Sequence, residues 1–441
     1  MSCIHLLYCD KSHYQQFTPP FDIPDSWEWV RLGDVCDVAR GGSPRPIKSY
    51  LTYRVDGINW IKIGDTEKDG KFINSTKERI IPEGALKSRL VHKGDFLLTN
   101  SMSFGRPYIL NIDGCIHDGW LVISPIGNVF DKDFLYLLLS SEYAYYQFSE
   151  KASGSAVSNL NSDKVAESIF PLPPLETQRI IVRECEKLTS FAQTIDNEKK
   201  DLEITIALTK SKILDLAMQG KLVPQDPADE PATDMLRRIN PKAKIITDNP
   251  QCRNLPLGWT LCQLRDLCSF LSRGKSPKYS ETPNQYPVFA QKCNLKDGDI
   301  SLTQARFLDE NTISKWPEKY RLRDGDVLVN STGTGTVGRT RMFKSEYLGN
   351  YPFVVPDSHV SVVRSFDEID STYIFYCLYC QDGQQYFAEN LAGSTNQKEL
   401  YIDVIGDKSI MLPPINEQKR IVAKIEEQYS VLYEIEASLR S

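Results

Sequence analysis

The loop Asn330–Thr336 is the part of this 441-residue chain whose side chains most directly suggest a chemical role. Its run Asn-Ser-Thr-Gly-Thr-Gly-Thr alternates amides and hydroxyls with glycines, and Arg339 follows it. Glycine allows a backbone to approach a ligand closely, while amides and hydroxyls hydrogen-bond phosphates or base edges. A guanidinium pairs well with guanine. The loop therefore has the composition of a nucleic-acid contact.

Further loop residues share these amide, hydroxyl and cationic groups. In the first half of the chain the candidates for DNA contact are Arg40, Arg45, Lys48, Lys62, Asn100, Ser101, Ser103 and Arg106. In the second half they are Arg273, Lys275, Lys278, Asn330, Ser331, Thr332, Thr334 and Arg339. Cations position a protein on phosphates, and Asn, Gln and Arg distinguish bases. The competing interpretation is a solvated hairpin loop with a few surface cations.

The two sets of candidates belong to two copies of one pattern. The opening Ile23–Cys36, with its Pro-Asp-Ser-Trp, returns as Leu255–Cys268, with Pro-Leu-Gly-Trp. The closing Leu172–Arg179 returns as Leu412–Lys419. Between these anchors the two copies diverge in sequence and loop length, as connecting segments tolerate. A duplication with matched ends and different middles predicts one scaffold that presents two different recognition surfaces.

A long helix is expected after each copy, over residues 174–219 and 414–441. Apolar side chains recur at steps of four and three from Ile181 to Leu216, and from Ile421 to Leu439. Such a seam is typical of a coiled coil, and the prolines before each helix suit a first turn. We expect the two seams to pack against each other in antiparallel fashion. The alternative is an amphipathic helix that lies on its own domain.

The segments between the anchors indicate β-rich domains. Short apolar runs such as Phe96–Thr99 and Val327–Asn330 are separated by Gly, Pro and Asp, and one helix is expected in each copy, over Lys132–Glu150 and Ser371–Glu389. The predicted fold class is α+β. The expected divisions are an N-terminal segment (1–23), head one (24–170), a spacer helix and linker (171–254), head two (255–410) and a C-terminal spacer helix (411–441).

Composition bounds the class of protein. The chain has a net charge of −6 and 11 cysteines. An odd, scattered set of cysteines argues against a disulfide framework, and no apolar run is long enough for a membrane helix, so the sequence predicts a cytoplasmic protein. Acidity counts against a free-standing DNA binder, but the acid lies mainly in helices and linker, whereas the candidate loops are basic.

Motifs for catalysis or cofactors are weak throughout. Cys377 and Cys380 form a C-x-x-C inside an apolar helix with no second pair at zinc spacing. The five histidines do not cluster, and Gly333-Thr334-Gly335 lacks the lysine and helix of a phosphate-binding loop. Asp118 and Asp357 are interpreted as turn acids that correspond between the copies. We expect no catalytic residue, no metal and no bound cofactor in this chain.

Taken together, these pieces resemble the specificity subunit of a Type I restriction-modification system. The resemblance rests on the two openings, on Gly41–Pro44 with Ile58–Asp65, on Lys93–Arg106 with its repeat Asp324–Arg339, on Leu172–Arg179, and on Met218–Pro227. The resemblance implies that each head recognises one half of a split double-stranded DNA sequence. It also implies that the helices fix the number of base pairs between the halves.

The same resemblance implies the partners. Two methyltransferase subunits would dock on the spacer, bind S-adenosylmethionine and methylate adenine, and restriction/translocase subunits would add cleavage. The second helix lacks a counterpart of Leu202–Val223, which leaves open whether both docking sites are equally complete. The rival hypotheses are a coiled-coil adaptor with two interaction heads and no DNA, and a single-chain modification enzyme, whose cofactor motifs the chain lacks.

Overall fold

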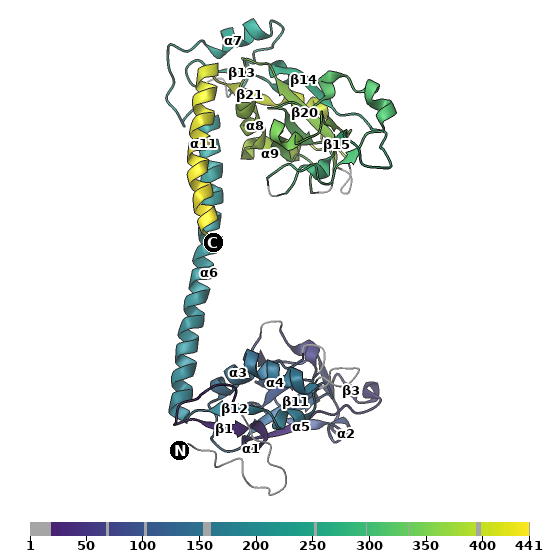
Figure 1. The fold of residues 1–441 in the computed structure, drawn as a ribbon, viewed down its shortest axis with the longest axis vertical. Helices are drawn as coiled ribbons and strands as arrows, with labels where there is room; N and C mark the ends of the chain where they lie inside the picture. Colours follow the sequence, from purple (N-terminus) through teal and green to yellow (C-terminus); the bar gives the residue numbers. More distant parts are fainter. Residues whose placement is uncertain are drawn as a thin grey trace. The chain divides into compact units, whose positions relative to one another are not determined.

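The computed structural model describes residues 19–67, 70–100, 104–152, 160–250, 254–296, 298–333, 335–393 and 398–440. The chain divides into two compact units, residues 1–195 and 196–441, of which the first contains head one and the second contains head two (Figure 1). None of the described helices is both long and apolar enough to cross a membrane.

Head one is built on two five-stranded sheets. The first has the order β2 (Cys36–Arg40), β11 (Trp120–Pro125), β8 (Phe96–Thr99), β9 (Pro107–Leu110) and β5 (Phe72–Ile73). The second has the order β3 (Leu51–Thr52), β6 (Glu78–Ile80), β4 (Ile58–Ile61), β10 (Gly114–Ile116) and β7 (Arg89–Val91). The predicted strand over 96–99 is confirmed with the same bounds.

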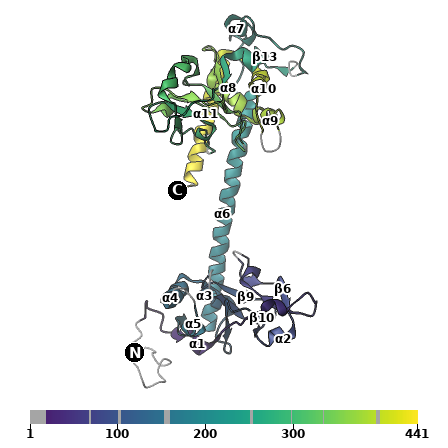
Figure 2. The same cartoon turned by 90° about the vertical axis from the view of Figure 1, so that its right-hand side faces the viewer.

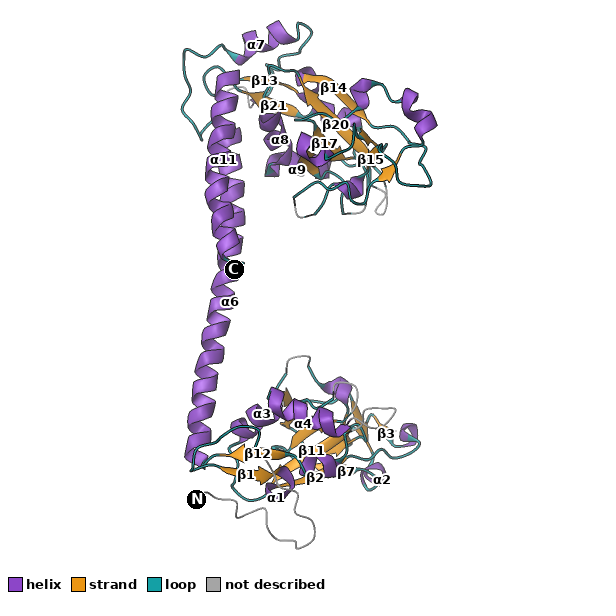
Figure 3. Ribbon diagram, viewed as in Figure 1, coloured by secondary structure: helices purple, strands orange, loops and turns teal. Residues whose placement is uncertain are grey.

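The first sheet of head one is covered on both faces, because alternate residues of a strand point to opposite sides. On β8, Leu97 packs with Ile61 of the second sheet, whereas Phe96 and Leu98 join the cluster that contains Leu135 of α3 (Lys132–Ser140). All are almost fully buried. The core of head one is therefore a sheet held between a second sheet and a helical layer (Figure 3).

Head two repeats this plan with smaller sheets, of four and three strands. One sheet has the order β14 (Cys268–Arg273), β20 (Val360–Ser365), β17 (Val327–Asn330) and β18 (Thr340–Met342), which matches β2-β11-β8-β9. The other has the order β16 (Arg306–Phe307), β15 (Pro287–Phe289) and β19 (Val355–Pro356). Both heads contain a matched parallel pair, β4 with β10 and β15 with β19, and head one has a second parallel pair, β5 with β9. The repeat seen in the sequence is thus a repeat of topology.

The helix expected in each head is in fact two helices. Head one has α3 and α4 (Glu142–Ala152), and head two has α8 (Ser371–Tyr379) and α9 (Gln381–Glu389). The break falls at Ser141 and Cys380, which both have extended backbone angles. Ser141 accounts for its break chemically, because its hydroxyl donates to the Leu138 carbonyl and accepts from the Ala144 amide.

Each head returns its chain to the point where it began. Strand β1 (Glu28–Arg31) pairs antiparallel with β12 (Ile169–Leu172), and β13 (Thr260–Gln263) pairs in the same way with β21 (Ser409–Leu412). A long helix follows each returning strand, α6 (Leu175–Met218) in the first copy and α11 (Ile415–Ser438) in the second. The small α5 (Ser162–Ala166) and α10 (Ile402–Asp407) precede these returning strands.

A buried glutamine in the first turn of each long helix joins the helix to its head. The Gln178 amide donates to the Pro173 carbonyl and accepts from the Asp131 backbone N–H. Gln418 donates to the Pro413 carbonyl and accepts from the backbone N–H of Asp370. These contacts recur at matched positions of the repeat.

Their partners are themselves fixed in the head. Asp131 and Asp370 cap α3 and α8, since each carboxylate accepts two backbone N–H groups of the first turn. Both glutamines are fully buried. The direction in which each helix leaves its head is therefore set by hydrogen bonds to the start of another helix.

The end of α6 and α11 pack side by side in antiparallel fashion within the second unit (Figure 2). The Lys210 ammonium contacts the Glu436 carboxylate at 2.8 Å, and the Tyr429 hydroxyl donates to the Lys210 carbonyl at 2.9 Å. Ile213 of α6 and Ile425 of α11 are buried in one cluster. The predicted pairing of the seams is confirmed for this part of α6.

The seam is not covered along the whole of α6. The seam residues Leu188, Ile195 and Leu202 have 68%, 48% and 38% of their surface exposed. α6 has 44 residues and α11 has 24, so the shorter helix matches only part of the longer one.

Between α6 and head two, residues 220–231 form a clasp over the start of α11. Gly220 has a φ of +66°, and a Cβ there would lie 2.4 Å from a side-chain carbon of Pro256. The Gln225 amide donates to Glu417 at 3.0 Å, and Arg420 contacts Asp229 at 2.8 Å. The clasp leads into a helix that the sequence did not predict, α7 (Ala232–Ile239).

Glu417 gives the clasp a pH dependence. Its side chain is fully buried, and burial raises the pKa of Glu417 against the opposing effect of the hydrogen bond from Gln225. An acid whose pKa is raised on folding favours the folded state at low pH, and this benefit is lost as pH rises through the folded-state pKa. The ionised carboxylate therefore costs stability at neutral pH.

We expect Glu417→Gln to raise the free energy of unfolding at neutral pH, because the amide keeps an acceptor for Gln225 without a buried charge. The gain should shrink as pH falls through the folded-state pKa of Glu417 and be absent below about 4.3, where glutamate is protonated in the unfolded chain as well. Thermal denaturation across this pH range measures it. Glu427→Gln, an exposed position paired with Lys424, is the matched control and should change stability by less than about 0.5 kcal/mol. A variant less stable than the wild-type chain at pH 7 would contradict the argument.

Candidate nucleic-acid interface

In head one, three candidate residues and Ser43 meet at Asp118. The Asp118 carbonyl accepts from the guanidinium of Arg40 at 3.1 Å and from the amide of Asn100 at 2.8 Å. The Asp118 carboxylate accepts from the Ser43 hydroxyl at 2.8 Å and lies 3.5 Å from the Arg45 guanidinium. The hydrogen bond from Ser43 holds the pKa of Asp118 below its ordinary value. Asp118 thus connects the end of β2 with the loop that follows β8.

The strand register identifies the counterpart of Asp118 in head two. Leu121 pairs with Arg40 in head one, and Ser361 pairs with Arg273 in head two. Asp118 therefore corresponds to Ser358, and the expected match of Asp118 with Asp357 is wrong by one residue. The role as a turn acid does hold for Asp357, whose carboxylate accepts from the His359 backbone N–H.

Arg273 repeats the contact made by Arg40. Two of its guanidinium nitrogens donate to the Ser358 carbonyl at 3.0 and 2.6 Å, and a third contacts the Glu399 carboxylate. Only 26% of the Arg273 side chain is exposed. Arg273 therefore fastens the hairpin at Ala392 and Glu399 to β14, and most of its hydrogen-bonding capacity is used inside the head.

The amides at the ends of the central strands are buried. Asn330 ends β17, donates to the Gln291 carbonyl at 3.3 Å and accepts from Asn294 at 3.1 Å. In head one, Asn100 follows β8 at the position that Ser331 has after β17, and it is also buried. Ser331, which follows Asn330, is buried and hydrogen-bonds Ser361 at 2.6 Å. The structure places these predicted contact residues beneath the loop surface, where they hold neighbouring loops together.

Other candidate cations remain at the surface. Arg45 has 85% of its side chain exposed and Lys278 has 74%, with an ion pair to Asp309 at 2.7 Å. Lys48 is exposed. Surface ion pairs contribute little free energy, so these side chains can exchange a carboxylate partner for a phosphate at small cost.

Lys62 and Lys275 are partly buried. The Lys62 ammonium contacts Glu78 at 2.7 Å, and the Lys275 ammonium lies 4.4 Å from the centre of the Tyr320 ring. Both are therefore engaged on the surface of their own head.

Each head has a loop with a Gly-Arg pair, Gly105-Arg106 in head one and Gly338-Arg339 in head two. These Gly-Arg loops place Arg106 and Arg339 at matched positions. Arg339 donates to the Asn294 carbonyl at 2.6 Å, and Arg106 lies 5.4 Å from the Tyr108 ring centre. Thr332 is partly exposed and bonds the exposed His359 at 2.8 Å. The candidates Ser101, Ser103 and Thr334 lie outside the described residues.

Four residues that organise these loops did not stand out in the sequence as loop ligands: Asp118, Gln291, Asn294 and Glu399. Each acts on a partner far along the chain, so no local spacing identifies it. Cys377, in the discounted C-x-x-C, is buried in the core of head two with its sulfur 3.4 Å from that of Met218. Burial raises the pKa of Cys377, which fits a packing role as a neutral thiol.

We expect Asn330→Ala to act mainly on stability. The change removes two buried hydrogen bonds and leaves the Gln291 carbonyl and the Asn294 amide with fewer partners, at a cost of about 1–3 kcal/mol. Chemical denaturation measures this cost. Asn311→Ala, an exposed asparagine of the same head, serves as control and should stay within about 0.5 kcal/mol of the wild-type chain. Wild-type stability with selective loss of DNA binding would instead make Asn330 a direct contact.

Comparison with known proteins matches this arrangement to one family. The model of the Type I restriction modification DNA specificity domain matches the chain twice, over residues 24–206 and 256–440. The Type I restriction enzyme EcoEI specificity subunit of Escherichia coli is 23% identical, with 96% of this chain and 81% of that protein covered. The MjaVIII specificity subunit of Methanocaldococcus jannaschii is 22% identical, with 91% and 86% covered.

A solved structure has the same fold. The HsdS subunit from Thermoanaerobacter tengcongensis superposes with a TM-score of 0.60 at 22% identity, and 95% of each chain is covered. Both matched segments combine a β-rich head with the helix that follows it, as seen here in two copies. The chain therefore belongs to the Type I restriction modification DNA specificity family.

Proposed function

We propose that this chain gives a Type I restriction-modification complex its DNA sequence specificity, and that each head recognises one half of a split target. The observation that carries the proposal is the double match to the DNA specificity domain, with one match on each head and its helix. Because the two heads share a scaffold but differ in their loops, the two half-sites differ in sequence. The chain itself is a non-catalytic subunit.

The loop architecture supports recognition of DNA. In both heads an arginine at the end of an edge strand binds a turn carbonyl, which holds the neighbouring loop in one conformation. Preformed loops lose little conformational entropy on binding, so their hydrogen bonds contribute more to selectivity. The exposed Arg45, Lys48 and Lys278 are suited to phosphates, which position a protein on the duplex.

The partners follow from the family. Specificity subunits work with methyltransferase and restriction subunits, and we propose that two methyltransferase subunits join this chain, one for each copy of the repeat. S-adenosylmethionine then binds those subunits and not this chain. The rival hypothesis, an adaptor with two protein-binding heads, predicts no affinity for duplex DNA and no effect on DNA methylation.

Adenine methylation in the genome tests the proposal. Long-read sequencing of a host that carries the complete system should show a methylated motif of two short half-sites separated by unspecified bases. The motif should disappear when this gene is deleted and return with a plasmid copy. Absence of any gene-dependent motif, in cells where the chain co-purifies with an active methyltransferase, would refute the proposal.

We further expect Arg45→Ala to weaken binding of the complex to specific and random DNA alike, because an exposed guanidinium neutralises a phosphate. The logarithmic dependence of affinity on salt should become shallower by about 0.9 for the lost contact. Fluorescence anisotropy over a salt series measures it. Lys93→Ala, an exposed cation in the turn before β8, is the matched control and should leave the slope unchanged. An unchanged slope for Arg45→Ala would remove this residue from the interface.

A further inference from the structure

Both heads have a cavity at the same place in the repeat. It lies between the Gly-Arg loop and the junction of two head helices, α3 with α4 in head one and α8 with α9 in head two. The cavity of head one has a volume of about 370 Å³ and is lined by Arg106 together with Glu142 and Tyr145 of α4. The cavity of head two has a volume of about 420 Å³ and is lined by Arg339 together with Tyr379 and Gln384 of α8 and α9. These volumes are in the range of ligand pockets.

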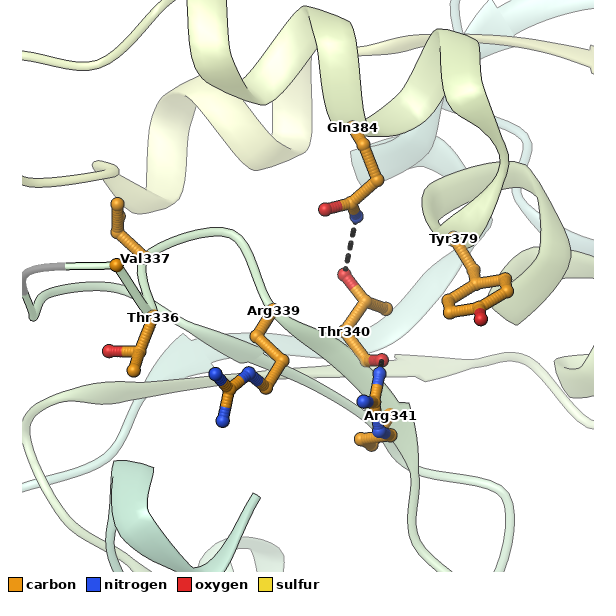
Figure 4. Close-up of a pocket in the computed structure, with 8 residues that line it drawn as sticks. Thr336, Val337, Arg339, Thr340, Arg341, Tyr379 and Gln384 are labelled. Atoms are coloured by element: carbon orange, nitrogen blue, oxygen red, sulfur yellow. Dashed lines mark hydrogen bonds between the residues drawn. The ribbon is translucent and has the colours of Figure 1, made fainter. Parts of the chain in front are cut away.

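The lining of the second cavity offers both a donor and an acceptor (Figure 4). One guanidinium nitrogen of Arg339 donates to the Asn294 carbonyl. Arg339 also lines the cavity, where its other guanidinium N–H groups can serve as donors. The Gln384 amide nitrogen donates to the Thr340 hydroxyl at 3.2 Å and to the Leu378 carbonyl at 2.8 Å. Both amide protons are thus engaged, and the amide oxygen, which points away from Thr340 in Figure 4, is left as an acceptor.

Tyr379 supplies the aromatic wall of this cavity, with 41% of its surface exposed. An exposed ring beside a donor and an acceptor favours a ligand that is itself flat and polar at its edge. The groove edge of a base pair offers such donors and acceptors, and the thymine methyl group can contact an aromatic side chain.

The cavity of head one has the same three kinds of group from different residues. Glu142 is exposed at the first position of α4, and an ionised carboxylate can only accept hydrogen bonds. Tyr145 forms the aromatic wall, with 56% of its surface exposed and its ring edge-on to Phe104 at 6.0 Å. Arg106 occupies the position that Arg339 has in head two.

The walls of both cavities are held by the fold. The loop glycines Gly105 and Gly338 have φ values of +73° and +81°, and their N–H groups donate to the Thr99 and Asn330 carbonyls. In head two, a Cβ at Gly383 would lie 2.5 Å from the Cys377 carbonyl, so α8 and α9 meet too closely for any larger residue. Groups on such rigid elements can discriminate between ligands that differ by one hydrogen bond.

We infer that the two cavities are base-recognition pockets, in which an arginine of the Gly-Arg loop and an acceptor of the second helix select a base pair in each half-site. Arginine pairs with guanine, whereas Glu142 and the Gln384 oxygen accept from the amino group of cytosine or adenine. The inference rests on the proposed function, and it names side chains of α4 and α9 that the loop candidates did not include.

The pockets also account for a difference between the half-sites. The acceptor is the first residue of α4 in head one but the fourth residue of α9 in head two, one helical turn further along. One acceptor is a charged carboxylate and the other is a neutral amide oxygen. The same scaffold therefore presents its acceptor at a different depth and with a different charge, so the two heads select different base pairs.

Methylation mapping of pocket variants in the complete complex tests the inference. Glu142→Ala should relax the methylated motif at a single position of one half-site, with discrimination lowered by about 10- to 100-fold. Gln384→Ala should do so in the other half-site only. Gln385→Ala and Glu150→Gln, exposed neighbours on the same helices, are the controls and should leave the motif unchanged.

A conservative change separates recognition from structure in head two. Gln384→Glu keeps an acceptor oxygen but removes the two amide donations to Thr340 and Leu378. If the oxygen contacts a base, Gln384→Glu retains a preference at the position that Gln384→Ala loses. If the amide protons only hold the loop, both variants lose the preference equally, and the inference is overturned.

The remaining outcomes are also decisive. An unchanged motif in an active complex with either alanine variant would overturn the pocket assignment for that head. Equal loss at both half-sites would assign the cavity to assembly with a protein partner instead. Absence of a split motif in the wild-type complex would refute the proposed function itself, which distinguishes that failure from failure of the pockets.

Discussion

A fully buried glutamine at the start of each long helix is the contact on which the arrangement of both copies depends. Gln178 and Gln418 each bridge a proline carbonyl before the helix and the backbone N–H of the aspartate that caps the first head helix. Because both ends of the amide are satisfied, the junction has one favourable geometry, and a substitution there leaves buried backbone groups unpaired. A protein that recognises two separated half-sites needs such a junction in each copy.

The two copies differ just beyond this shared junction. The position before Gln418 is Glu417, which binds the clasp through Gln225, whereas the position before Gln178 is Thr177. In the second unit the clasp, Arg420 and Asp229 add contacts around the start of α11. The repeat therefore preserves the joint between head and helix, and it varies the contacts that surround that joint.

The sequence predicted those strands and helices whose formation depends on neighbouring residues in the chain. Strands β8 and β17 follow from apolar runs between turn residues, and the paired seams follow from periodicity. The break at Ser141 and the short helix α7 were missed, because the first depends on one hydroxyl and the second on packing of Met235 and Leu236 into the core of head two. Neither residue type signals such a role by itself.

The sequence predicted the chemical groups of the candidate site but not how deeply they are buried. Asn100 and Asn330 have the right groups for adenine, yet both are buried and bind backbone carbonyls. An amide serves a loop backbone as well as a base edge, and only long-range packing decides which. Glu142 and Gln384, by contrast, lie on helices, whereas the sequence predicted contacts only in loops.

Among the described loop residues, most candidate cations are engaged within their own head, whereas Arg45, Lys48 and Lys278 are exposed. With a net charge of −6, the chain has little capacity to attract DNA through phosphates alone. In the proposed complex, specificity and affinity are therefore separated: the loops and pockets would supply base selection, and the neighbouring subunits would supply most of the electrostatic attraction. This division keeps discrimination high, because phosphate contacts strengthen correct and incorrect sequences equally.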